Sequence, residues 1–152
     1  MLSRTTGRNR KTLLRLRVDS LGEAIYHARH RLVDVLHRLG FLGEDADAIE
    51  LAFTEALANA VRYGSVGPKA SVHVRVIQDA GQLVVEVTDH GSGFQPRSIE
   101  LPNAGDPAEG GRGLYLMRAF MDDVAWLVTP HGTTVRMTKR VPNRPPAMED
   151  TA

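Results

Sequence analysis

Two hairpin patterns constrain the fold of this sequence more than any other feature. In the first pattern, apolar and polar residues alternate over residues 71–76, so that Val72, Val74 and Val76 share one face. This alternation is typical of a half-buried strand. Short glycine-containing turns between such segments join antiparallel strands. The paired segments are residues 71–78 and 83–88, joined by Asp79-Ala80-Gly81, and residues 124–129 and 134–140, joined by Pro130-His131-Gly132.

Helical patterns surround the hairpins and define the layers. Their apolar residues recur at helical spacing on one side only, so each helix is expected to pack on a flat surface. Strands joined by short turns and one-sided helices predict an α/β two-layer sandwich, in which a mostly antiparallel, mixed sheet carries helices on one face. The expected order is a strand over 12–18, a helix from a Ser20–Glu23 capping box to Gly40, a helix over 45–63 stopped by Gly64, the first hairpin, a helix over 114–121 and the second hairpin.

Charge is distributed unevenly along the chain. The net charge is +1, yet six basic residues fall in the first 17 positions, which leaves 13 basic and 18 acidic residues in the remainder. A remainder with a balance of −5 does not suit a general nucleic-acid binder, because phosphate neutralisation supplies most non-specific affinity. We expect residues 1–11 to form a flexible basic arm, 12–141 one domain and 142–152 a flexible tail. A contact of the arm with an acidic partner or nucleic acid is the alternative.

Composition excludes several classes of protein. The chain contains no cysteine, so disulfide scaffolds, cysteine zinc sites and cysteine nucleophiles are excluded. No apolar run approaches the roughly 18 residues of a membrane-spanning helix. The apolar patch at Leu13, Leu14 and Leu16 is too short and too charged for a signal peptide. The sequence predicts a soluble cytoplasmic domain with no membrane partner.

The first segment that could carry chemistry lies on the second predicted helix. Residues four apart on a helix lie one above the other, so the carboxylate of Glu55 and the amide of Asn59 point the same way. Both lie at the margin of the apolar arc, where a helix edge can line a cleft. A carboxylate beside an amide oxygen suits a general base and a magnesium ion. The alternative is an exposed polar pair on an amphipathic helix.

The second segment follows the first hairpin and reads Thr88-Asp89-His90-Gly91-Ser92-Gly93-Phe94. A carboxylate at the end of a strand can accept a hydrogen bond from an exocyclic amine. Gly91 and Gly93 would let the backbone approach a flat ligand closely. The alternative is a glycine-rich turn, and His90 either lines the pocket or faces solvent.

The third segment, Glu109-Gly110-Gly111-Arg112-Gly113-Leu114, precedes the short third helix. Its glycines expose backbone amides, and a helix N-terminus adds partial positive charge, so phosphate is a natural ligand. It is neither a P-loop nor a Rossmann fingerprint, because no Gly-Lys-Ser/Thr follows and Leu116 stands where the third glycine is needed. Residues 91–113 are expected to form a long loop. A mobile hinge is the alternative.

Together, and in this order, the three segments resemble the nucleotide site of the Bergerat-type ATPases, which include histidine kinases, type II topoisomerases, the ninety-kilodalton heat-shock chaperone and MutL. The stretches EGGRGLYLMRAFMDDVAW and GTTVRMTKR resemble more closely the anti-sigma-factor serine kinases of bacterial partner-switching systems. The resemblance covers residues 12–141. It rests on the three segments, the Met-Asp-Asp after the third and the Gly-Thr-Thr of the last strand, all in register.

The resemblance implies a role for each matching residue. Glu55 matches a catalytic base that draws the proton from a serine or threonine hydroxyl of a protein substrate. Asn59 matches the ligand of Mg²⁺, and Asp89 matches the carboxylate that binds the adenine amine. The other matches are Gly91 and Gly93 under the base, 96–110 as a lid, Gly111, Arg112, Gly113 and Leu114 where the lid meets the phosphates, and Thr133 near the adenine.

The function implied is that of an ATP-dependent serine/threonine protein kinase that is also an anti-sigma factor. Its expected partners are ATP or ADP with Mg²⁺, a sigma factor, a STAS-type anti-anti-sigma protein as substrate and a second copy of the chain, with no direct contact to nucleic acid. The alternative is a catalytically silent nucleotide-binding module that sequesters a protein partner without phosphorylating it. The presence of Glu55 favours the kinase, because a pure binder needs no base.

Two features depart from the family pattern. Tyr63-Gly64 stands where many relatives have His-Gly, and we interpret the tyrosine as a packing residue of the apolar arc. Histidine kinases also need a phospho-acceptor histidine on a dimerising helix. The first helix carries His27, His30 and His37, of which His30 and His37 are interpreted as part of a solvated face.

Overall fold

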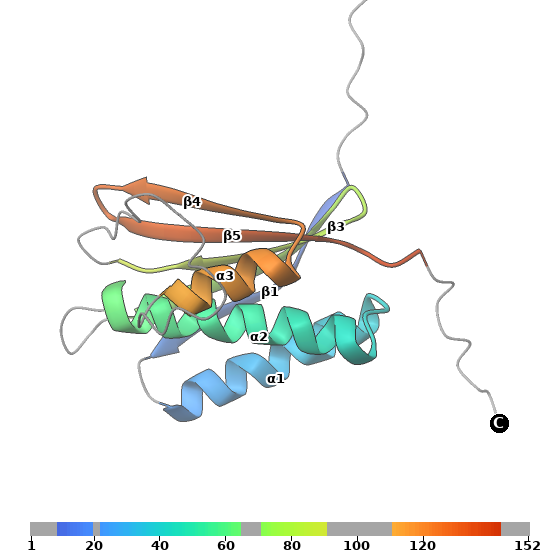
Figure 1. The fold of residues 1–152 in the computed structure, drawn as a ribbon, viewed down its shortest axis with the longest axis horizontal. Coiled ribbons are helices and arrows are strands. Elements are labelled where there is room, and N and C mark those ends of the chain that lie inside the picture. Colours follow the sequence, from blue (N-terminus) through green and yellow to red (C-terminus); the bar gives the residue numbers. More distant parts are fainter. Residues whose placement is uncertain (1–8, 20–21, 65–70, 91–110, 144–152) are drawn as a thin grey trace, which may run out of the picture.

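The computed structural model describes residues 9–19, 22–64, 71–90 and 111–143 (Figure 1). The expected capping box at Ser20 and the expected lid lie outside these ranges. The elements in chain order are β1 (Arg10–Asp19), α1 (Gly22–Arg38), α2 (Gly43–Asn59), the π-helical turn η1 (Ala60–Gly64), β2 (Ser71–Asp79), β3 (Gln82–Thr88), α3 (Gly111–Phe120), β4 (Asp123–Thr129) and β5 (Gly132–Arg140).

The fold is the predicted two-layer α/β sandwich. Five strands form one sheet in the order β1-β2-β3-β5-β4, and all four pairings between the described strands are antiparallel. The three helices lie together on one face of the sheet (Figure 1). Since no described helix covers the opposite face, the sheet has one packed side and one side available for polar residues.

The core lies between the helices and the sheet and follows the predicted periodicities. Val72, Val74 and Val76 of β2 are buried. On the helical side, α1 buries every third or fourth residue along one stripe. The buried residues of the first two helices are Ala28, Leu32, Val35 and Leu36 on α1, and Ala46, Ile49, Ala52, Phe53, Ala56 and Leu57 on α2.

Both hairpins are tighter than predicted, because each has a two-residue loop. Asp79 pairs with Gln82, which leaves Ala80 and Gly81 in the first loop, with φ values of 49° and 79°. Positive φ at both loop positions matches the right-handed twist of the flanking strands. Thr129 pairs with Gly132 in the second hairpin, so the glycine belongs to β5 rather than to the turn.

Most element boundaries differ from the predictions by one to three residues, and two of these differences affect the expected arm and loop. β1 begins at Arg10, so Arg10 and Lys11 belong to the sheet and not to the arm; they pair with Asp79 and Gln78 of β2. Hydrogen bonding to the full length of β2 overrides their charge, and long basic side chains suit an exposed edge strand. α3 begins at Gly111, three residues before the expected start, so the expected loop ends earlier.

The Met-Asp-Asp stretch joins α3 firmly to the sheet. The Met121 amide donates to the Met117 carbonyl, at 3.0 Å. Asp122 Oδ2 accepts the Arg140 amide at 2.7 Å, and Lys139 Nζ donates to the Phe120 carbonyl at 2.8 Å. These bonds satisfy carbonyls at the end of α3 and fix the helix against β5.

Candidate functional site

The carboxylate and amide predicted on α2 lie against the first turn of α3. A Cβ added to Gly113 would lie 2.8 Å from Glu55 Oε2 and 3.5 Å from Asn59 Nδ2. Gly113 itself is buried, and Glu55 and Asn59 are each half-buried. The glycine therefore allows α3 to approach both polar side chains closely, which brings the first and third segments together.

The local geometry of both helices suits a polar ligand at this point. The first amides of an α-helix have no partner within the helix and give its N-terminus partial positive charge, and Gly111 to Gly113 form the first turn of α3. On the other side, α2 changes to a π-helical turn at Ala60, directly after Asn59. Such single-turn widenings occur frequently at functional sites, because they re-aim neighbouring side chains.

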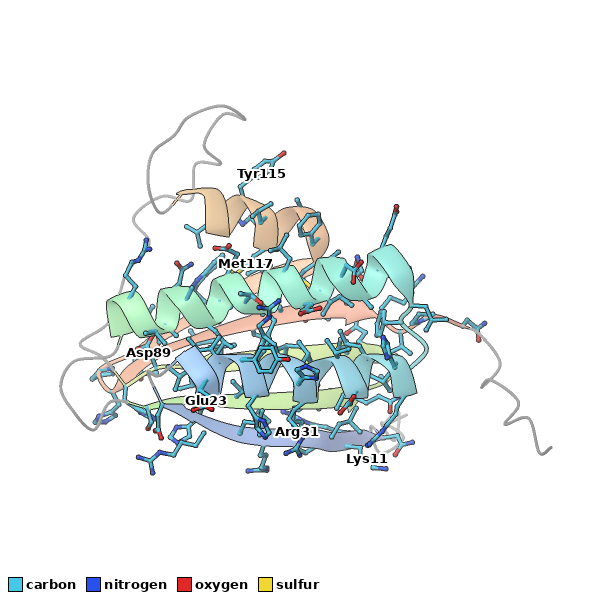
Figure 2. The ribbon with its side chains drawn as sticks, turned by 90° about the horizontal axis from the view of Figure 1, so that it is seen from below. Lys11, Glu23, Arg31, Asp89, Tyr115 and Met117 are labelled. Carbon is cyan, nitrogen blue, oxygen red and sulfur yellow. The ribbon has the colours of Figure 1, made fainter. Side chains whose placement is uncertain are left out.

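The second predicted segment is tied to the last strand through its aspartate. The Asp89 amide donates to the Thr133 carbonyl at 2.9 Å, and the Thr133 amide donates to Asp89 Oδ1 at 3.3 Å. Both residues are buried, at 7% and 3% exposure. The backbone of Thr133 thus orients the carboxylate, which lies at the opposite end of the sheet from Lys11 (Figure 2).

A pocket brings residues of all three segments and of the last strand together. Its lining includes the polar residues Asn59, Asp89 and Thr133, while apolar surface forms most of it. This is the usual composition of a site for a small organic ligand. The full lining consists of Asn59, Ala60, Val87, Asp89, Leu114, Trp126, Thr133 and Val135.

The polar residues that line the pocket offer the types of group through which an adenine nucleotide binds, an acceptor for an amine and an oxygen ligand for a metal ion. Thr133 Oγ1 is buried and has no hydrogen-bond partner among the described residues. A buried hydroxyl without a partner costs free energy, so a ligand or water is its expected partner. Asp89 offers a carboxylate beside it and Asn59 an amide oxygen, which is a suitable donor for Mg²⁺. Within the described residues, no cluster of three or more metal-ligating His, Cys, Asp or Glu side chains occurs.

Several predicted site residues have no described side chain or lie outside the described ranges. Gly91, Gly93 and the expected lid over 96–110 are outside them, as is the side chain of Tyr63. Gly111 and Arg112 are described only as backbone of α3.

The histidines outside the pocket occupy exposed positions. His90 is exposed and lies with Nε2 2.7 Å from Nδ1 of His73 on β2, and it is not among the residues that line the pocket. His30 and His37 are exposed, as interpreted from the sequence.

The pocket-lining valines Val87 and Val135 were not assigned to the site from the sequence, and two further contributors were missed. Trp126 lines the pocket, although its strand pattern marked it only as a β4 residue. Gly132 was assigned to a turn, but a Cβ there would overlap the carbonyl oxygen of Asp89. Its position directly before the Thr-Thr pair of the family-like stretch was the available signal.

None of the helices in the described ranges is both long and apolar enough to span a bilayer. The buried surfaces of these helices face the sheet and one another. Met117 of α3, for example, points toward α2, whereas Tyr115 points away from the body of the molecule (Figure 2).

Comparison with known proteins identifies the family. The family described as histidine kinase-like ATPase domain matches residues 18–139. The serine-protein kinase RsbW of Bacillus pumilus is 31% identical over 84% of this chain and 85% of its own length, and that of Listeria monocytogenes is 30% identical over 83% and 85%.

A solved structure shows the same fold. The RsbU and RsbW domains of a Mycobacterium tuberculosis protein match with a TM-score of 0.62 and 20% identity, over 84% of this chain and 31% of that one. Residues 18–139, which the family model matches, contain the α2–α3 contact and the Asp89–Thr133 pair. The chain therefore belongs to the histidine kinase-like ATPase domain family and, within it, to the family of the RsbW serine-protein kinases.

Proposed function

We propose that this chain is an ATP-dependent serine/threonine protein kinase that also acts as an anti-sigma factor. One observation carries the proposal: Asn59, Asp89 and Thr133 line one pocket, and the buried Thr133 hydroxyl has no hydrogen-bond partner among the described residues. Glu55 lies next to Asn59 against the first turn of α3. A carboxylate at that place can serve as the general base in phosphoryl transfer, whereas binding a nucleotide alone needs no base.

Each residue has a distinct task in this proposal. Asp89 accepts a hydrogen bond from the base, and Thr133 offers its hydroxyl beside it. Asn59 holds Mg²⁺, which supplies charge neutralisation at the phosphates when bound. The amides of the first turn of α3 hold phosphate oxygens. Glu55 accepts the proton of the acceptor hydroxyl as the hydroxyl oxygen bonds to the γ-phosphorus of ATP. The bond from that phosphorus to the β–γ bridging oxygen breaks at the same time, and ADP leaves.

The partners in this proposal follow the family to which the chain belongs. The protein substrate is a STAS-type anti-anti-sigma protein, phosphorylated on serine or threonine. The second partner is a sigma factor, which the chain holds in a manner that depends on bound ATP or ADP. The protein acts in the cytoplasm as a homodimer.

Removing the proposed base tests the catalytic part. We expect Glu55→Ala to lower phosphoryl transfer from ATP to a STAS partner by about 10²–10⁴-fold, the usual contribution of a general base. ATP affinity should change little, because Glu55 is not among the pocket-lining residues. Radiolabel transfer and calorimetric titration measure the two quantities. The matched control is Glu50→Ala on the same helix, whose carboxylate pairs with Arg29 of α1 at 2.9 Å.

The same titrations test the metal ligand. In Asn59→Ala, ATP affinity should lose its dependence on Mg²⁺. An unchanged dependence would contradict the assignment of Asn59. Transfer by Glu55→Ala at the parent rate would contradict the base. A parent that binds ATP but transfers no phosphate to any STAS protein would favour the silent binding module.

A further inference from the structure

The single tryptophan of the chain forms part of the floor of the pocket. In the register of the sheet, Val87 of β3 pairs with Val135 of β5, and Val135 pairs with Trp126 of β4. All three line the pocket, so one row of side chains crosses three strands beneath it. Trp126 is the largest member of the row and is half-buried.

The polar end of the pocket lies two residues further along the same segments of chain. Asp89 follows Val87 by two residues, and Thr133 precedes Val135 by two, which corresponds to about 7 Å along a strand. The pocket thus has hydrogen-bonding groups at one end and an apolar row with an indole at the other. A flat bicyclic base can contact both ends at once, whereas a smaller ring held by the polar end reaches less of the indole.

Helix α3 holds the tryptophan in place. The guanidinium carbon of Arg118 lies 5.6 Å from the centre of the Trp126 ring, within the range of a cation–π contact. Leu114 lies four residues before Arg118, on the same face of α3, and it also lines the pocket. Since the guanidinium covers one face of the indole, the opposite face or the ring edge remains to contact a ligand.

We propose that Trp126 contacts the nucleobase and selects a purine, and that Arg118 positions its indole. This inference rests on the proposed function, since it specifies what the same pocket binds. Aromatic contact with a base does not distinguish hydrogen-bonding patterns but increases with the area of the ring. In this site Asp89 would recognise an exocyclic amine, and Trp126 would recognise the size of the ring that carries it.

A comparison of ATP with CTP separates these two contributions, because both bases carry an exocyclic amine. By calorimetric titration, the parent should bind ATP more tightly than CTP. Trp126→Ala should lower the affinity for ATP by about tenfold, within the range of base–aromatic stacking. It should lower the affinity for CTP by clearly less. Trp126→Phe should stay within about threefold of the parent. The matched control is Leu127→Ala, the next residue of β4, which is exposed and does not line the pocket.

Fluorescence gives an independent readout, since Trp126 is the only tryptophan. ATP and ADP should shift or quench its emission, whereas tripolyphosphate with Mg²⁺, which lacks a base, should not. Arg118→Gln should alter the emission of the protein without nucleotide. It should also lower the affinity for ATP, but by less than Trp126→Ala does. Thermal melts of each variant verify that the fold is retained.

The outcomes distinguish this inference from the proposed function. If the parent binds no ATP, the proposed function itself fails. If the parent binds ATP while Trp126→Ala binds it within twofold, or loses ATP and CTP affinity equally, only the role of Trp126 is overturned. The role of Trp126 would also be overturned if calorimetry shows that ATP binds but the tryptophan emission does not change.

Discussion

At the scale of single residues, the close approach of Gly113 to the side chains of Glu55 and Asn59 leaves little space for a Cβ atom at position 113. A methyl group at this position would lie 2.8 Å from Glu55 Oε2, which is the end of a flexible side chain. The carboxylate can rotate away, so the fold should tolerate the change. Alanine also has the higher helix propensity, by up to about 1 kcal/mol.

We therefore expect Gly113→Ala to separate activity from stability. The thermal midpoint should stay constant or rise slightly. Phosphoryl transfer should fall by about 10- to 100-fold, because a base displaced by about 1 Å loses its geometry. The control is Gly22→Ala on α1, where a Cβ meets nothing within 4 Å; it should leave transfer unchanged. Full activity in Gly113→Ala would show that the position of Glu55 is not critical.

At the scale of elements, the two hairpins differ in what their glycines must avoid. Gly81 has a φ of 79° with open space around the Cβ position, so only conformational strain opposes a side chain there. Gly132 has a φ of 147°, and its Cβ position overlaps the carbonyl oxygen of Asp89. Backbone cannot rotate away as a side chain can. The β4–β5 hairpin and the site residue Asp89 are therefore constrained together.

Urea unfolding of two variants tests this difference. Gly81→Ala should lower the free energy of unfolding by about 1–2 kcal/mol, the usual penalty for an ordinary residue in the left-handed region. Gly132→Ala should cost roughly 3 kcal/mol or more, since strain and a steric clash combine, and it should weaken ATP binding by displacing Asp89. Equal losses in the two variants would mean that the chain relaxes around Gly132 at little cost.

The same elements show which features were predictable from the sequence. The spacing of Glu55 and Asn59 fixes their common direction on one helix, because that property is local. The approach of Gly113 to them, and of Gly132 to Asp89, depends on how α3 and β5 pack, which no local pattern encodes. Trp126 was missed for the same reason. Its register opposite Val135, and not its neighbours in the sequence, brings it to the pocket.

At the scale of the whole molecule, the uncovered face of the sheet carries a row of charges. Glu86 is buried at 7% exposure; Arg75 donates to it at 3.0 Å, and Arg136 lies 3.9 Å away on the adjacent strand. Arginine stems thus cover the carboxylate on a face where no described helix does. The molecule consequently has an apolar interior on one side of its sheet and an ionic layer on the other.

His73 joins this layer to the strand end that bears Asp89, and it should make stability depend on pH. Partial desolvation of the largely exposed His73 side chain, followed by the charges of His90 and Arg17, lowers the pKa of His73 below its ordinary value of 6.5. Arg17 pairs with it in the register of β1 and β2, and His90 lies 2.7 Å away. A group whose folded pKa is lowered binds its proton more readily in the unfolded chain, so protonation favours unfolding.

The free energy of unfolding should therefore be highest above pH 6.5 and should fall as the pH decreases through that value. In His73→Gln the fall between pH 7.5 and 5.5 should be smaller than in the parent, because one source of preferential protonation has been removed. The difference should be modest, since solvent screens an exposed imidazole. Urea unfolding at both pH values measures it, with His37→Gln on the exposed side of α1 as control. If the free energy of unfolding falls equally in the parent and in His73→Gln between pH 7.5 and 5.5, the His73–His90 contact does not oppose protonation.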